Sequence, residues 1–156
     1  MRREGGGSEG NRERGTGNRK RGTGNGEQRM TRDYRDLVVW QQAMALCESV
    51  YVLLRKFPAE EKYALCDQLR RAVVSIPSNI AEGRGRGSTK DFVRFLYQAQ
   101  GSLNEVFTQL ELACRLGLVS HGTGLYEEAT EIARMLSSMI KRLREHAQPK
   151  SLKAKS

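Results

Sequence analysis

Residues 75–83 read Ser-Ile-Pro-Ser-Asn-Ile-Ala-Glu-Gly, and this stretch decides how the second long helix of the chain must be built. The apolar residues around it recur at helical spacing, so it is predicted to be the second half of a helix with a proline inside. Pro77 has no backbone N–H, and its ring collides with the carbonyl of Val73, four residues earlier. Such a proline costs roughly 3 kcal/mol in a helix interior, so a kink or compensating packing must offset it. Gly83 is expected to close the segment.

The rest of the chain repeats one pattern, in which apolar residues are separated alternately by four and by three positions. This spacing is typical of helices packed in a bundle. It runs through four segments, 39–57, 65–83, 92–113 and 125–143. No segment alternates at period two, so no strand is predicted. Because the links are short, we expect an all-α protein, an up-down-up-down antiparallel four-helix bundle.

Capping signals predict where these helices begin and end. A Gly-Arg-Gly-Arg-Gly turn at 83–87 is expected to separate the second helix from the third, and Gly117 is expected to end the third. No strand precedes the glycine-rich turn, which argues against a phosphate-binding loop. The predicted starts are Asp36 as the cap of the first helix, Glu60 or Glu61 for the second, and Ser88 with Asp91 for the third.

The positive charge is concentrated at the two ends of the chain. The net charge is +9, and residues 33–140 contribute almost nothing to it. Residues 1–32 contain a tandem repeat, NRERGTG then NRKRGTG, and almost no apolar side chain, which predicts a disordered Gly/Arg-rich tail. We expect the bundle over 33–146 and a basic tail over 147–156. The tails suit a polyanion such as RNA; alternatively they only solubilise, or the repeat precedes a true start at Met30.

The cysteines indicate the compartment. They are odd in number, well separated and embedded in apolar sequence, which predicts small buried thiols in a reducing environment. The N-terminus lacks the apolar core of a secretory signal, and no 18-residue apolar run exists. We therefore expect a cytoplasmic protein that does not span a membrane. The three cysteines are Cys47, Cys66 and Cys114.

The sequence offers little for catalysis. His121 and His146 lack a helical partner at metal-ligand spacing, which speaks against a metal site in the bundle core. Ser75 and Ser78 have no nearby base, and no cysteine has an adjacent histidine. No catalytic residue, metal or other cofactor is expected, so we predict a non-enzymatic protein.

The strongest candidate site is a group of basic residues around the predicted turn at 83–87. Such side chains, with the N–H groups at the start of the third helix, would contact phosphates without reading sequence. Alternatively, Arg70 and Arg71 pair with Glu82, Asp67 or Glu61, which leaves only the arginines of the turn to contact a phosphate. The candidate nucleic-acid-binding residues are Arg70, Arg71, Arg84, Arg86, Lys90 and Arg94.

Two further features suggest contacts between helices or subunits. Asn79 falls on the predicted core seam, with Ser75 and Glu82 on the same side, and a buried carboxylate there would need an arginine partner. On the first helix, a second apolar stripe lies beside the core seam, which indicates another contact surface. Its aromatic members, Trp40 and Tyr51, are the candidate oligomer interface, or the docking site of a protein–protein adaptor.

Four motifs carry a family resemblance: LVVWQ at 37–41, QLRRA at 68–72, SIPSNIAEG at 75–83 and GSLNE at 101–105. They resemble the family of small bacterial four-helix-bundle proteins first noticed as open reading frames in intervening sequences of 23S ribosomal RNA genes. That family is similar in fold to the accessory variability protein of diversity-generating retroelements. The resemblance covers about residues 33–143.

The resemblance implies a cyclic homo-oligomer, with a pentamer as the expected state, and a positively charged surface or channel. It also implies binding to ribosomal RNA, and its retroelement relatives partner a reverse transcriptase. We therefore expect a structured-RNA-binding homo-oligomer, with an adaptor or accessory subunit, for example of a reverse transcriptase, as the alternative. The residues that match the family motif are Arg70, Arg71, Ser75, Asn79 and Glu82. Alternatively, these motif residues have a structural role, as do Pro77 and Gly83 in the same motif.

Overall fold

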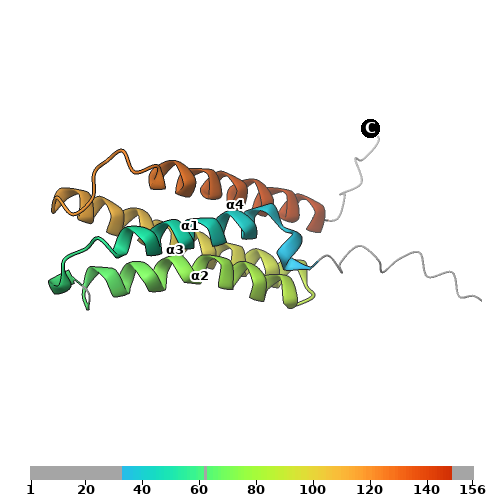
Figure 1. The fold of residues 1–156 in the computed structure, drawn as a ribbon. Helices are drawn as coiled ribbons and strands as arrows, with labels where there is room; N and C mark the ends of the chain where they lie inside the picture. Colours follow the sequence, from blue (N-terminus) through green and yellow to red (C-terminus); the bar gives the residue numbers. More distant parts are fainter. Residues whose placement is uncertain (1–32, 62, 149–156) are drawn as a thin grey trace, which may run out of the picture.

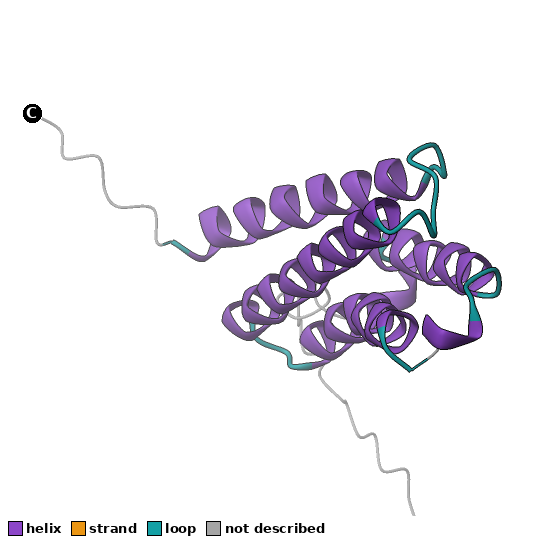
Figure 2. Cartoon of the chain, turned by 90° about the vertical axis from the view of Figure 1, so that its left-hand side faces the viewer, coloured by secondary structure: helices purple, strands orange, loops and turns teal. Residues whose placement is uncertain are grey.

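Four long helices make up most of the described chain, which comprises residues 33–61 and 63–148 of a computed structural model. They are α1 (Val38–Leu54), α2 (Leu65–Gly85), α3 (Thr89–Arg115) and α4 (Leu125–Ala147), and two single turns, η1 (Tyr34–Asp36) and η2 (Ala59–Glu61), precede α1 and α2. No strand occurs in the described residues (Figures 1 and 2). The all-α fold is confirmed, whereas the predicted tails, apart from Ala147 and Gln148, lie outside the described residues.

Each helix packs against its neighbours in the chain, and α1 also packs against α4, so the four helices enclose one core. The alternating four-and-three spacing predicted this core, which consists of buried apolar side chains. No polar or charged residue of the described chain is buried in it. The largest fully buried side chains are Leu46, Leu69, Ile76, Ile80, Leu96, Leu103, Leu110, Ile132 and Leu136.

The predicted starts of the first two helices are wrong. Asp36 lies inside η1, whose cap is Asp33, and α1 begins after Leu37 without a side-chain cap. In this extra turn, the ring of Tyr34 packs edge-on against that of Trp40, with 5.3 Å between the ring centroids. Glu60 and Glu61 likewise form the separate turn η2, because Ala64 (φ −106°, ψ −97°) leaves the helical region.

The predicted limits of α3 are confirmed. The Ser88 hydroxyl accepts a hydrogen bond from the backbone N–H of Asp91 at 3.0 Å and donates to the Asp91 carboxylate at 3.1 Å. At the other end, Gly117 adopts φ +71°, and the N–H of Leu118 reaches back to the carbonyl of Ala113 at 2.9 Å. This is a Schellman motif, which requires a residue with positive φ.

Gly83 does not close α2, and residues 83–85 are helical, so the predicted turn at 83–87 is too long. The reversal uses Gly87, which has φ +74°. Gly83 is buried, and a Cβ there would lie 2.5 Å from the Cβ of Phe95. Its role is therefore to let α2 and α3 approach each other, not to end a helix.

Pro77 is buried inside α2, which continues through it. The carbonyl of Val73 cannot receive a bond from Pro77, but the thiol of Cys47 on α1 donates to it at 3.2 Å. Burial raises the pKa of Cys47 to about 11, so the thiol keeps the proton that this hydrogen bond needs. Packing against α1 thus compensates for the proline. All three cysteines are buried and unbridged, as predicted.

Candidate nucleic-acid interface

The up-down-up-down path brings three stretches of the chain, two of them basic, to one end of the bundle (Figure 1). This basic end consists of residues 33–36 before α1, residues 82–94 around the α2–α3 turn, and residues 141–148 at the end of α4. It contains eight Lys/Arg and five Asp/Glu. At the opposite end, the described residues around the α1–α2 and α3–α4 links carry more carboxylates than cations. The bundle is therefore electrically polarised along its axis.

The structure divides the six predicted binding residues into two groups. Four of them belong to the basic end, namely Arg84, Arg86, Lys90 and Arg94. Arg70 and Arg71 lie fourteen and thirteen residues before Arg84 on α2, which separates them from it by roughly 20 Å at 1.5 Å per residue. Arg70 is ion-paired with Asp67 at 3.0 Å, as the alternative interpretation expected. The six residues therefore do not form one patch, and their binding role stays a prediction.

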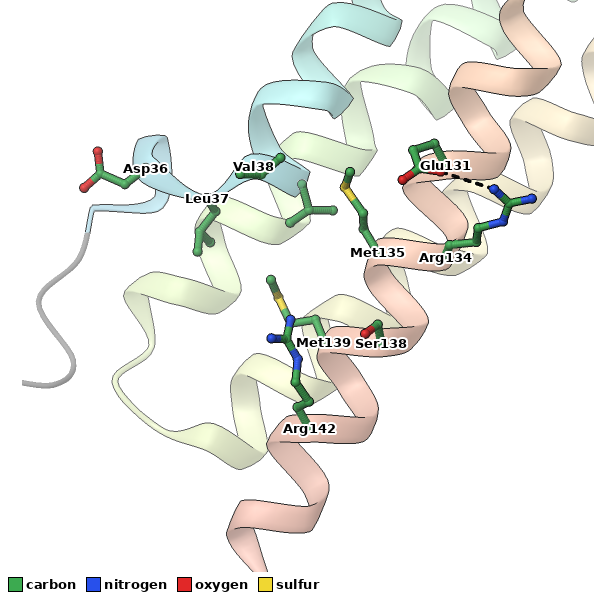
Figure 3. A pocket seen from close by; sticks show the side chains of 10 residues that line it. Asp36, Leu37, Val38, Glu131, Arg134, Met135, Ser138, Met139 and Arg142 are labelled. Atoms are coloured by element: carbon green, nitrogen blue, oxygen red, sulfur yellow. Dashed lines mark hydrogen bonds and ion pairs between the residues drawn. The ribbon is translucent and has the colours of Figure 1, made fainter.

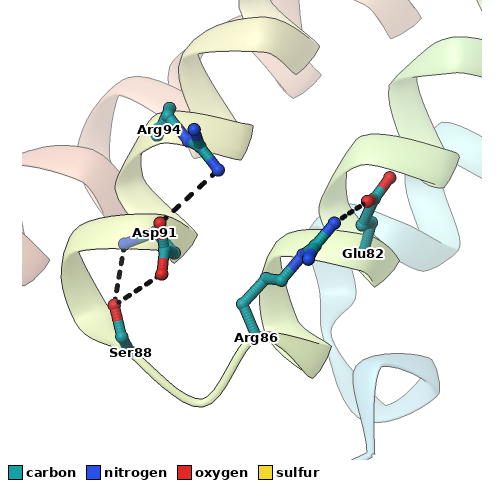
Figure 4. A network of polar contacts seen from close by, with 5 residues as sticks. All are labelled: Glu82, Arg86, Ser88, Asp91 and Arg94. Atoms are coloured by element: carbon teal, nitrogen blue, oxygen red, sulfur yellow. Dashed lines mark hydrogen bonds and ion pairs between the residues drawn. The ribbon is translucent and has the colours of Figure 1, made fainter.

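Two arginines of the basic end are held in place by carboxylates, which Figure 4 shows, and by one aromatic ring. Arg86 pairs with Glu82, and Arg94 pairs with Asp91 at 3.5 Å. Both guanidinium carbons lie 5.2 Å from the centroid of Phe95. These contacts position the arginines but neutralise part of their charge, while the side chains stay at least half exposed.

The other cations of the basic end differ in their contacts. Arg84 stacks over Phe92, with 5.8 Å from its guanidinium carbon to the ring centroid. Lys90, Lys141 and Arg142 are exposed and make no ion pair with any described residue. From the sequence, the α4 cations were counted only as part of the positive charge near the C-terminal end of the chain. The bundle order itself was the signal that could have placed them beside the α2–α3 turn.

The motif residues Ser75 and Asn79 tie α2 to itself and to α3. The Asn79 side-chain amide donates to the carbonyl and the hydroxyl of Ser75, both at 2.9 Å, and the Ser75 hydroxyl lies 2.8 Å from that of Ser102. Asn79 is half-buried, and Ile80 occupies the core instead, so the predicted seam position is wrong. Glu82 is exposed, contrary to the prediction of a carboxylate on the buried side.

The predicted second stripe on α1 is only partly a surface. Cys47 and Leu54 are buried, and Trp40 is half-buried against the core and Tyr34. Tyr51 and Met44 remain exposed. Two further apolar side chains that sequence reasoning did not select, Val38 and Val52, are exposed on the same helix. The candidate interface residues Trp40 and Tyr51 therefore differ in access, and their role in assembly stays a prediction.

Two grooves flank the second half of α4. The α1–α4 groove, of about 520 Å³, lies between the start of α1 and α4; Leu37, Val38, Met135 and Met139 line it, and Arg142 lies at its rim (Figure 3). The α3–α4 groove, of about 400 Å³, lies on the other side. There, Arg144 donates to the Tyr97 hydroxyl at 3.1 Å, and Gln100 donates to Ser137 at 2.9 Å.

A polar cluster at the opposite end joins α3 to α4. The Glu111 carboxylate accepts hydrogen bonds from Arg115 at 2.8 Å and from the Tyr126 hydroxyl at 3.2 Å. The bond from Arg115, with the weaker one from Tyr126, lowers the pKa of Glu111. Desolvation, together with nearby negative charge, raises the pKa of Tyr126 to about 12. The tyrosine is thus a neutral donor at neutral pH, and this cluster is a helix-to-helix link.

The described residues contain neither a candidate metal site nor a candidate membrane-spanning helix. No three His, Cys, Asp or Glu side chains in this part of the chain gather closely enough to hold a metal ion. None of its helices combines the length and the hydropathy needed to cross a bilayer.

Comparisons with known proteins identify the family. Residues 35–138 match the family described as 23S rRNA-intervening sequence protein. A crystal structure from Bacteroides thetaiotaomicron VPI-5482, described as a protein of unknown function from the S23 ribosomal protein family, is similar with a TM-score of 0.63 and 28% sequence identity. The match covers 67% of this chain and 99% of that one, whereas no curated protein matches. The chain belongs to the 23S rRNA-intervening sequence protein family.

Proposed function

We propose that this protein is a non-enzymatic, homo-oligomeric binder of structured RNA, and that its basic end makes the contact. One observation carries the proposal: two basic stretches far apart in sequence, residues 82–94 and 141–148, converge at the same end of the bundle. The family name, which refers to 23S rRNA, makes ribosomal RNA the first RNA to test. Residues 33 and 148, which adjoin the two basic terminal segments in the sequence, both lie at this end.

Binding of this kind is dominated by phosphate contacts. Each cation that neutralises a phosphate releases counterions, so affinity falls steeply as salt rises. Lys90, Lys141 and Arg142 are suited to this task, because their charge is not compensated by any described carboxylate. The carboxylate-paired Arg86 and Arg94 would contribute less charge but better fixed geometry.

The test is fluorescence anisotropy of a labelled ribosomal RNA stem-loop with the full chain, over a range of salt. The double variant Lys90→Glu/Lys141→Glu should weaken binding and lower the slope of log affinity against log salt by about one for each phosphate that is no longer neutralised. Arg55→Glu/Lys56→Glu is the matched control, because it makes the same charge change at the opposite end. Equal weakening in both variants, or none in the first, would contradict a localised interface.

Self-association is proposed through the exposed apolar side chains of α1. Val38 is 57% exposed and Val52 is 52% exposed, and Val38 also lines the α1–α4 groove. Light scattering after size exclusion should report a closed oligomer, and Val38→Ser/Val52→Ser should shift it toward monomer. If the wild-type chain is monomeric at all concentrations, this apolar surface favours the adaptor function, with a different protein as its partner.

A further inference from the structure

We propose that the α3–α4 groove binds an unpaired nucleotide of the RNA, with its base stacked on Tyr97. This inference rests on the proposed RNA-binding function and names the part of the RNA that the protein recognises. It adds Tyr97 and Arg144 to the interface, neither of which the sequence motifs indicated.

Tyr97 is an exposed aromatic ring in a basic setting. It is 47% exposed, and it lies on α3 one turn after Arg94. Arg144 of α4 crosses the groove and donates to its hydroxyl at 3.1 Å. This bond fixes the tyrosine, whose ring remains accessible. An aromatic face held among cations is the usual platform on which proteins stack nucleobases.

The groove itself offers complementary chemistry. Its volume is about 400 Å³, and the buried Ile140 contributes an apolar part to its lining. Gln100 and Glu145 supply amide and carboxylate groups that suit the edges of a base, and Lys141 supplies a charge for its phosphate. The remaining lining residues are Ser137, Arg144 and Gln148.

This arrangement selects unpaired nucleotides over duplex. Bases inside an A-form helix are already stacked on their neighbours, and their major-groove edges are out of reach of side chains. A tyrosine in a groove between two helices can therefore receive only a base that is already out of the stack, in a loop, a bulge or a single strand. The exposed cations Lys90 and Arg94 lie on the same helix toward the basic end, where they would follow the flanking phosphates.

The test compares two RNAs of equal length and charge, a stem-loop with unpaired loop bases and a fully paired duplex. The full wild-type chain should prefer the stem-loop. Tyr97→Ala should weaken stem-loop binding by roughly tenfold, as expected for one base stacked on an aromatic ring, and leave duplex binding unchanged. Tyr97→Phe should keep the preference, because its ring still stacks. Tyr63→Ala, which removes an exposed tyrosine (80%) just before α2 at the opposite end of the bundle, should have no effect.

A second measurement needs no variant. A 2-aminopurine placed in the loop should lose fluorescence when the wild-type chain binds, because stacking on an aromatic ring quenches it. If stem-loop and duplex bind equally, or if Tyr97→Ala weakens both alike, the inference is overturned while the proposed function stands. If neither RNA binds at any salt concentration, the proposed function fails, and the inference fails with it.

Discussion

The α2–α3 pair and the surroundings of α4 are packed in different ways within one bundle. α2 and α3 meet through small residues: Gly83 contacts Phe95, and the hydroxyls of Ser75 and Ser102 lie 2.8 Å apart. α4 meets its neighbours through long side chains, and grooves of about 520 and 400 Å³ lie along its flanks. Small residues let two backbones approach, whereas long ones hold them apart.

The difference separates scaffold from recognition surface. Close packing with few voids gives a pair of helices a single arrangement, so α2 and α3 can hold the α2–α3 turn and its arginines in place. The recessed surfaces beside α4 are where another molecule could bury side chains or bases. Three sets of variants would test this contrast, and their expected effects decrease in the order given.

The largest effect is expected from truncating core leucines. Leu103→Ala on α3 should reduce the free energy of unfolding by about 4 kcal/mol, because the close-packed side of the core cannot collapse into the cavity. Leu136→Ala on α4 should cost only about 2.5 kcal/mol, since α4 can shift toward the core. Both leucines are essentially fully buried, and urea unfolding measures both. Equal costs would show that the two sides are equally rigid.

A smaller effect is expected from adding a methyl group at two helical glycines. Gly83→Ala should destabilise the protein by about 2 kcal/mol, because the new Cβ would press against Phe95 and push α2 away from α3. Gly101→Ala is the matched control on α3: nothing lies within 4 Å of its Cβ position, so it should stabilise by about 0.5–1 kcal/mol. Thermal unfolding of both variants compares them directly, and a neutral Gly83→Ala would refute the close contact.

The smallest effect concerns the compensation for Pro77. In the wild-type chain, Cys47→Ala removes the thiol that donates to the Val73 carbonyl, besides leaving a small cavity. In a Pro77→Ala background, the new N–H at position 77 satisfies that carbonyl, so the same change should cost less. The double-mutant cycle should give a coupling of about 1 kcal/mol. A coupling near zero would mean that the thiol bond contributes nothing.

Local signals predicted those features that depend on neighbouring residues. The Ser88 cap and the Gly117 stop follow from short-range backbone geometry, and the buried cysteines follow from their apolar surroundings. The predictions for Asp36, Glu61 and Gly83 were wrong because the deciding contact lies elsewhere. Trp40 packs on Tyr34, Ala64 interrupts the helix, and Phe95 approaches Gly83.

The sequence by itself determined the bundle, because the four-and-three spacing of apolar residues gives each helix one buried face whatever the partner. It also showed that positive charge belongs to the ends of the chain. Only the tertiary structure decided which cations meet, since residues 84–94 and 141–144 are neighbours through antiparallel packing alone. It likewise decided that Tyr97 lies in a groove beside Arg144, because that contact spans 47 residues of sequence.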